Sequence, residues 1–158
     1  PILLDRLTPQ GSIPKPAPGG PGGLAGILAG MGGSGGLGSI LGSMLGGVVR
    51  YCMTLLTQNI AVFSIPYGTL ISNTAGCLVI GVIAGISGKT ELLSTEMRLL
   101  LATGFCGGFT TMSSFVYELA QFVQDKELYY ASFYFTATLA GAGLAFTVGL
   151  LLSELILR

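Results

Sequence analysis

Long apolar stretches separated by a few charged residues set the pattern of this chain. Apolar and small residues dominate positions 37–56, 68–86, 99–123 and 128–152. A charge near the centre of a bilayer costs a few kcal/mol on insertion scales, so charges mark loops or functional positions. Each stretch has about the 20 residues that a helix needs to cross a bilayer. The pattern therefore predicts an all-α membrane protein with four transmembrane helices.

The polar stretches between these segments fit short loops. Turn-forming residues at 64–68 precede the second span, SGKTELLSTEMR at 87–98 forms an aqueous loop, and charged residues at 125–127 form the last turn. Four spans place both ends of the folded part on one side of the membrane. Lys and Arg are more frequent on that side, but the difference is small without Arg6 and Lys15. Insertion in both orientations therefore stays open.

Composition supports a surface that faces lipid. Hydrophobic residues make up 51% of the 158 residues and charged residues 9%, whereas a soluble domain carries about 25% charged residues. Seven basic and seven acidic residues cancel, so no basic field is present that would bind nucleic acid. The chain has no histidine, no paired carboxylates at active-site spacing and no phosphate-binding loop after a strand. We therefore expect that the protein is not an enzyme.

The first 36 residues differ from the rest of the chain. Gly and Pro dominate them, as in PKPAPGGPGG, and such a composition cannot bury enough apolar surface to fold. We predict a disordered N-terminal segment at 1–36, followed by one four-helix domain at 37–158.

Small and hydroxyl residues gather in the middle of the third span. The string GFCGGFTTMSSF at 104–115 contains two adjacent glycines, followed by Thr110, Thr111, Ser113 and Ser114. This pattern favours a break in the helix, and non-helical backbone is tolerated at membrane depth only where it is buried in protein or lines water. Half-helix ends expose carbonyls that suit a cation and N–H groups that suit an anion. The alternative is that the hydroxyls bond to their own helix and merely bend it.

One amide and two charged residues within the spans each have two interpretations. Asn73, the only carboxamide in mid-membrane, either joins helices by a hydrogen bond or presents amide hydrogens to an anion. Arg50 either extends to the membrane surface or supplies positive potential at a pore mouth. Glu118 either guards a pore entrance or marks a helix boundary.

Three strings taken together resemble a known family. GSMLGGVVRY at 42–51, PYGTLISNTAGC at 66–77 and TGFCGGFTTMSSFVYE at 103–118 are similar in order and spacing to the Fluc (CrcB) fluoride channels. The resemblance covers about residues 37–158. It implies a dual-topology, antiparallel homodimer of four-helix subunits, with a broken third helix, two fluoride pores and a structural Na+ at the dimer interface. It also implies passive export of cytoplasmic fluoride through the plasma (inner) membrane, which protects the cell against fluoride toxicity.

The resemblance further implies roles for individual residues. Backbone carbonyls of Gly107 and Thr110 from both subunits would hold the Na+, and Arg50 and Glu118 would lie at the pore entrance. The fluoride pore would be lined by Asn73, Met112, Ser113, Ser114, Phe115, Tyr134 and Thr138. Met112 stands where the family has the first of two pore phenylalanines. Because a thioether is flexible and polarizable, we expect the pore to persist with altered throughput.

Two other functions stay open on the sequence. A small four-helix, dual-topology exporter of drugs or other cations would need a membrane carboxylate in its first helix for proton coupling, and this chain has none there. A non-conducting membrane assembly protein would explain the many glycines. It would leave Asn73 and the predicted break without a purpose.

Overall fold

The computed structural model describes residues 34–59, 65–90 and 92–157. Helices fill most of these ranges, and no strand occurs within them. The first helix begins at Ser34 and so includes the last residues of the predicted N-terminal segment. The rest of that segment lies outside the described residues, so its disorder stays a prediction.

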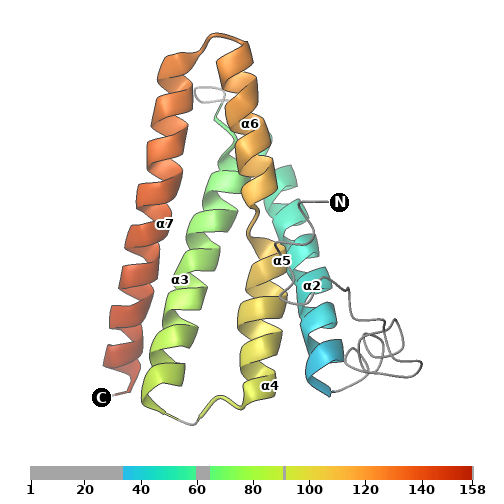
Figure 1. Cartoon of the computed structure of the whole chain (residues 1–158), viewed down its shortest axis with the longest axis vertical. Coiled ribbons are helices and arrows are strands. Elements are labelled where there is room, and N and C mark those ends of the chain that lie inside the picture. The colour runs from blue at the N-terminus through green and yellow to red at the C-terminus, as the bar shows by residue number, and fades with distance from the viewer. Residues whose placement is uncertain (1–33, 60–64, 91, 158) are drawn as a thin grey trace, which may run out of the picture. The chain divides into compact units, whose positions relative to one another are not determined.

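Four helical segments are long and apolar enough to cross a membrane, as the charge pattern predicts. They are α2 (Ser34–Thr57), α3 (Tyr67–Lys89), the series α4 (Thr95–Arg98), η1 (Leu99–Cys106), α5 (Gly107–Phe109) and α6 (Met112–Gln124), and finally α7 (Leu128–Ile156). In Figure 1, α2 starts and α7 ends at the end of the bundle where α4 lies. Four crossings bring the two ends of this part of the chain to one side.

The loop between the second and third spans is shorter than predicted. Helix α3 continues to Lys89, whose Nζ lies 2.7 Å from Oε1 of Glu154 on α7. The next helix begins after Ser94, whose Oγ accepts a 3.2 Å hydrogen bond from the Met97 N–H and so caps α4. Both features lengthen the helices at the expense of the loop at 87–98.

Glycines bring the helices into backbone contact. A Cβ on Gly42 or Gly46 of α2 would meet the backbone of η1 and α5, and a Cβ on Gly104 or Gly108 would meet the backbone of α2. Helix α3 packs on α7 in the same way at Gly81 and Gly149, and a Cβ on Gly85 would meet the Ser153 side chain of α7. Small residues permit such close approach where lipid offers no hydrophobic drive. These glycines are therefore helix-packing positions.

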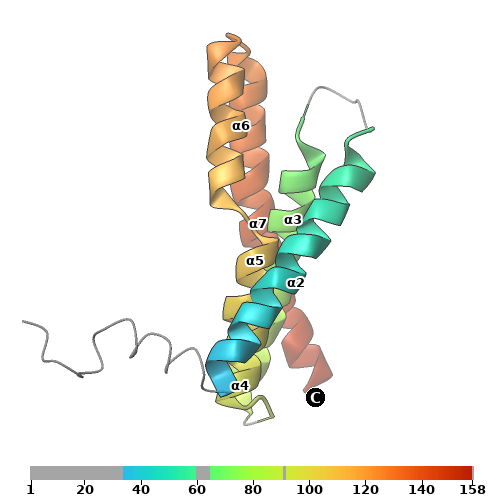
Figure 2. The ribbon, with the colours of Figure 1, turned by 90° about the vertical axis from the view of Figure 1, so that its right-hand side faces the viewer.

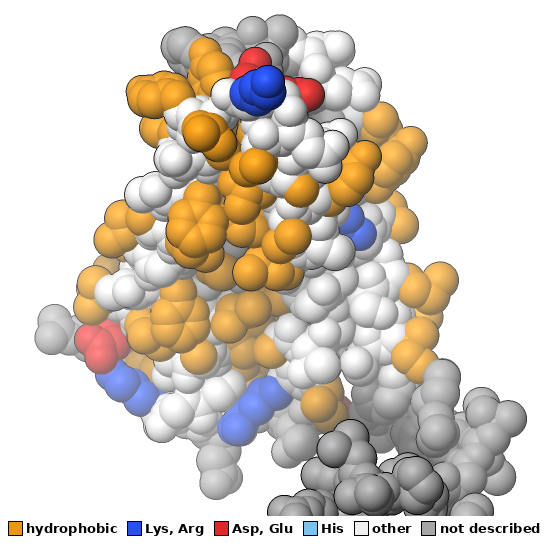
Figure 3. Space-filling view, turned by 45° about the horizontal axis from the view of Figure 1, so that its top comes forward, with side chains coloured by type: hydrophobic (Ala, Val, Ile, Leu, Met, Phe, Trp, Pro, Cys, Tyr) orange, Lys and Arg blue, Asp and Glu red, His pale blue; other side chains and the backbone are white. Residues whose placement is uncertain are grey.

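Figure 2 shows α6 and the upper part of α7 standing apart from the upper ends of α2 and α3. A cluster of buried residues joins α6 and α7 to the segment that precedes α3, formed by Ile65, Phe115, Phe122, Ala131 and Tyr134. Elsewhere hydrophobic side chains cover the flank of the molecule, and charged side chains gather mainly toward its ends (Figure 3). This distribution is the one that a membrane-spanning bundle requires.

Candidate functional site

The third span is interrupted between α5 and α6. Thr110 and Thr111 have extended backbone angles, φ −82° with ψ 155° and φ −149° with ψ 115°. The residues on either side are helical, and the two parts remain joined as one bent path through the bundle (Figure 1). The predicted break is therefore present, directly after the sequence Gly107-Gly108-Phe109.

Threonine side chains shape both ends of the break. The N–H and the hydroxyl of Thr110 each donate to the Cys106 carbonyl at 2.9 Å, which closes the last turn before the break. Thr111 caps α6, because its Oγ1 accepts a 3.2 Å hydrogen bond from the Ser114 N–H. Its hydroxyl also lies 3.2 Å from that of Ser113 and 3.1 Å from that of Ser114. Local hydroxyl bonding and a true break thus occur together.

Two side chains from neighbouring helices bind the backbone of the break. The Thr111 N–H donates to Oδ1 of Asn73 at 2.7 Å, and Nδ2 of Asn73 donates to the Thr111 carbonyl at 3.2 Å. From α2, Nε of Arg50 donates to the Gly108 carbonyl at 3.3 Å. Asn73 therefore does join two spans, the first of its two sequence-based interpretations. Its contact with an anion stays a prediction.

A cavity of about 210 Å³ adjoins the break between α3, α6 and α7. Its lining includes several residues of the predicted site, namely Asn73, Thr110, Met112, Phe115 and Thr138. Thr111 and Cys77 also line it, and Ile80, Leu139 and Ala142 supply apolar walls. A few polar groups in an otherwise apolar cavity are typical of a site for a small ligand.

Glu118 joins three helices on the far side of Phe115. Its Oε1 accepts a 2.8 Å hydrogen bond from the Thr69 hydroxyl of α3, and its Oε2 accepts a 2.6 Å bond from the Tyr134 hydroxyl of α7. Tyr134 is fully buried, and its ring centroid lies 5.3 Å from that of Phe115. Glu118 also lines a hollow of about 300 Å³ that includes Asp125 and Glu127. Glu118 therefore connects the buried aromatic pair with an acidic hollow at the α6–α7 turn.

The remaining predicted residues lie outside the cavity lining. Ser113 is exposed and Ser114 is half-buried. Gly107 is exposed, and nothing lies within 4 Å of the place where its Cβ would be. Arg50 binds the break from α2 and does not line the cavity. A single chain thus brings only some of the predicted site residues together at the cavity. Part of the break lies on its exposed surface.

The sequence pattern did not predict Thr69 and Cys77 as site residues. Thr69 binds Glu118, and Cys77 lines the cavity with Asn73. Residues four positions apart lie on one face of a helix, so 69, 73 and 77 share a face of α3. The spacing of four residues from Asn73, which lies in mid-membrane, could have identified both residues from the sequence.

The Na+ site that the resemblance to Fluc channels implies falls at the break and stays a prediction. The residues that the structure describes contain no group of three or more His, Cys, Asp or Glu that could hold a metal ion. The carbonyls at the end of α5 lack the helical partners that a continued helix would provide. Because a hard cation takes several oxygen ligands, the carbonyls of Gly107 and Thr110 from one chain would form only part of such a site.

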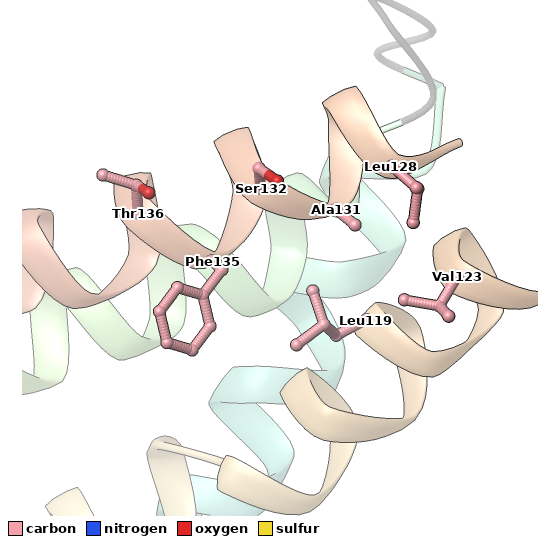
Figure 4. Close-up of a pocket in the computed structure, with 7 residues that line it drawn as sticks. All are labelled: Leu119, Val123, Leu128, Ala131, Ser132, Phe135 and Thr136. Carbon is pink, nitrogen blue, oxygen red and sulfur yellow. The ribbon is translucent and has the colours of Figure 1, made fainter. Parts of the chain in front are cut away.

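A larger groove lies between α6 and α7, apart from the break. It has a volume of about 410 Å³ and is lined by Leu119, Val123, Leu128, Ala131, Ser132, Phe135 and Thr136 (Figure 4). Its walls are mostly apolar, with hydroxyls only at Ser132 and Thr136. None of the predicted site residues lines it. The smaller cavity at the break is therefore the candidate site.

Comparison with known proteins places this chain in a family. The family described as CrcB-like protein, Camphor Resistance (CrcB), matches residues 37–150. The chain belongs to the CrcB family. The fluoride-specific ion channel FluC of Chlorobium phaeobacteroides strain BS1 is 41% identical over 114 residues, which are 72% of this chain and 88% of that protein. FluC of Prosthecochloris aestuarii is 42% identical over 113 residues with the same coverage. FluC of Chlorobaculum tepidum is 41% identical over 114 residues, 90% of that protein.

Membership of the CrcB family confirms the class of the protein. It is a multi-pass integral membrane protein, with four spans in the part of the chain that the structure describes, from a family of fluoride channels and not of enzymes. The resemblance that the three sequence strings indicate is confirmed. The match over 37–150 contains the break, Arg50, Asn73 and the cavity lining.

Proposed function

We propose that this CrcB-family protein is a passive, fluoride-selective channel that exports cytoplasmic fluoride through the plasma (inner) membrane and so protects against fluoride toxicity. The cavity at the break carries the proposal. There the amide of Asn73 and the hydroxyls of Thr110, Thr111 and Thr138 line a space beside the Phe115 ring. A small, strongly hydrated anion sheds water only against close hydrogen-bond donors and positive ring edges.

A second copy of the chain completes the channel. Gly107 and Ser113 are exposed in the single chain, and Thr110 and Thr111 are only partly covered. These residues lie in the middle of the third span, where non-helical backbone needs protein or water around it. An antiparallel homodimer, as the resemblance to Fluc channels implies, would cover the break of one subunit with that of the other. The surrounding bilayer would cover the remaining apolar flank.

A sodium ion at that dimer interface is part of the same proposal. Carbonyls of Gly107 and Thr110 from two subunits would supply neutral oxygen ligands without any carboxylate. Such a shell suits Na+ better than Ca2+, which usually recruits acidic ligands. One subunit holds only half of the shell, so the ion would stabilise the dimer by mass action.

The two rival functions have less support. A proton-coupled exporter of cations would need a carboxylate in the first span, and α2 contains neither Asp nor Glu. An assembly protein without conduction would leave the polar groups in the cavity at the break unexplained.

A liposome assay tests the proposal. Purified protein is reconstituted into liposomes loaded with potassium fluoride or potassium chloride, and anion release is followed with ion-selective electrodes after addition of a K+ ionophore. We expect fast fluoride release that depends on the ionophore, because a passive channel moves net charge, and little chloride release. Fluoride release no faster than from protein-free liposomes would refute the function. Uptake of an organic cation driven by a proton gradient would favour the exporter.

A further inference from the structure

The backbone of Thr111 has both of its polar groups bound by one side chain. In a continuous helix its N–H and C=O would pair with residues four positions away along the same helix. Thr110 and Thr111 are extended, so the Thr111 N–H loses its partner four residues back, whereas the Thr111 C=O stands at the N-cap of α6 and keeps the first hydrogen bond of that helix. Asn73 of α3 provides the missing acceptor at 2.7 Å and adds a donor to the C=O at 3.2 Å. A side-chain carboxamide offers the same pair of groups as a peptide unit.

We propose that Asn73 is a positioning residue that acts as a substitute peptide unit for Thr111 and thereby holds the third span in its broken conformation. A buried backbone group without a partner is costly. The broken backbone at Thr111 therefore persists because α3 presents this amide at the same depth. The inference goes beyond the proposed function and does not depend on which ion the cavity carries.

The position of Thr111 determines where α6 begins. Its hydroxyl accepts from the Ser114 N–H at 3.2 Å, so it caps the first turn of α6. On the other side, Thr110 closes the preceding helix through the Cys106 carbonyl. Between these two fixed ends, Asn73 binds both backbone groups of Thr111. The side chain thus sets the position of α6, and with it Phe115, relative to α3.

The paired bonds also fix the orientation of the Asn73 amide. Only Oδ1 can accept from the Thr111 N–H, so Nδ2 must lie beside the Thr111 carbonyl. One Nδ2 hydrogen is used by that carbonyl, and the second remains available in the cavity that Asn73 lines. Positioning therefore uses Oδ1 and one Nδ2 hydrogen, and the second Nδ2 hydrogen is left for donation. Asn73→Asp keeps an acceptor for the Thr111 N–H and removes both Nδ2 hydrogens.

Hydrogen–deuterium exchange observed by NMR tests the positioning role directly. Protein labelled with 15N-threonine in detergent reports the Thr111 amide, assigned with Thr111→Ser. Thr147, in the middle of α7, serves as an internal reference that cancels changes in overall stability. In Asn73→Ala the Thr111 exchange rate relative to Thr147 should rise roughly tenfold, as loss of about one buried hydrogen bond predicts. Ser72→Ala is the matched control, because its buried hydroxyl on the same helix has no hydrogen-bond partner.

The variant Asn73→Asp tests the bond between Oδ1 and the Thr111 N–H apart from donation by Nδ2, and it keeps the test valid if Asn73→Ala does not fold. A carboxylate oxygen still accepts from the Thr111 N–H, so relative exchange should stay within about threefold of the parent. Fluoride flux should fall, because the donor is lost and a negative charge enters the cavity. Parent-like exchange in Asn73→Ala would overturn the proposal, and so would equal loss of protection in Asn73→Asp and Asn73→Ala. If the parent itself fails to release fluoride, the proposed function falls while the exchange result still decides the role of Asn73.

Discussion

The hydroxyl of Tyr134 donates a 2.6 Å hydrogen bond to Oε2 of Glu118 and so ties α7 to α6. The other carboxylate oxygen accepts from Thr69 of α3, so one side chain links three helices. Since Tyr134 is fully buried and packs against Phe115, this link also holds the aromatic wall of the cavity.

Glu118→Gln should destabilise the protein. Glutamine has one acceptor oxygen where the carboxylate has two, so one of the two hydroxyls can no longer donate to residue 118, and the stronger charge-assisted bonds are lost. We expect a loss of about 1–3 kcal/mol, seen as a lower midpoint of thermal unfolding in detergent. Tyr134→Phe removes one of the two bonds and should show a smaller loss. A midpoint unchanged in both variants would show that the link contributes no stability.

Phe115→Ala should reduce fluoride flux strongly while a folded protein can still be isolated. The ring is 2% exposed and lines the cavity, so its removal takes away the positive ring edge that would face an anion. Phe133→Ala is the control, because Phe133 is 51% exposed and does not line the cavity. Initial efflux rates from liposomes give the comparison. Equal rates for Phe115→Ala and the parent would refute the pore assignment.

Met112→Phe should raise the rate of fluoride release. Met112 lines the cavity and is 66% exposed, so the chain has room for a larger ring there. A phenylalanine adds a second positive ring edge, which the thioether cannot offer. Met112→Leu, similar in volume and also without a ring edge, should conduct like the parent. A slower Met112→Phe variant would show that the flexible side chain is the better pore lining.

Gly46→Ala should disrupt the contact between α2 and the third span. A Cβ at Gly46 would collide with the backbone of Phe105, whereas nothing lies within 4 Å of a Cβ at the neighbouring Gly47. We expect Gly46→Ala to cost about 1–3 kcal/mol through forced backbone shifts, and Gly47→Ala to leave a single chain almost unaffected. Thermal unfolding in detergent measures both. Loss of dimer in Gly47→Ala, with an intact monomer, would instead place Gly47 at the subunit contact.

The spans were predictable because a charged side chain inside a bilayer is so unfavourable that the charges divide the chain almost unambiguously. The residue at which α3 ends was harder to predict from the sequence. Lys89 belongs to the helix and pairs with Glu154, which is far away in the sequence. No local pattern contains that partner, so the predicted loop began too early.

The break was predicted from its two glycines and hydroxyl residues, but its position and form depend on partners elsewhere in the chain. The extended residues are Thr110 and Thr111, and the amide that binds Thr111 lies 38 positions away. Glu118 likewise had two sequence-based interpretations, and α6 continues past it to Gln124, so it does not mark a helix boundary. Helical spacing identifies which residues share a face, whereas the choice of partner depends on how the helices pack.

The glycine contacts between α2 and the third span also bear on how the bundle assembles. Contacts made by long side chains freeze rotamers, and each frozen side chain opposes association by up to about 2 kcal/mol of conformational entropy. Gly42, Gly46, Gly104 and Gly108 have no rotamers to lose. Helices that are already formed in the bilayer have also lost the backbone freedom that makes glycine unfavourable in a folding soluble chain. These helices can therefore associate late, after insertion, with little entropic resistance.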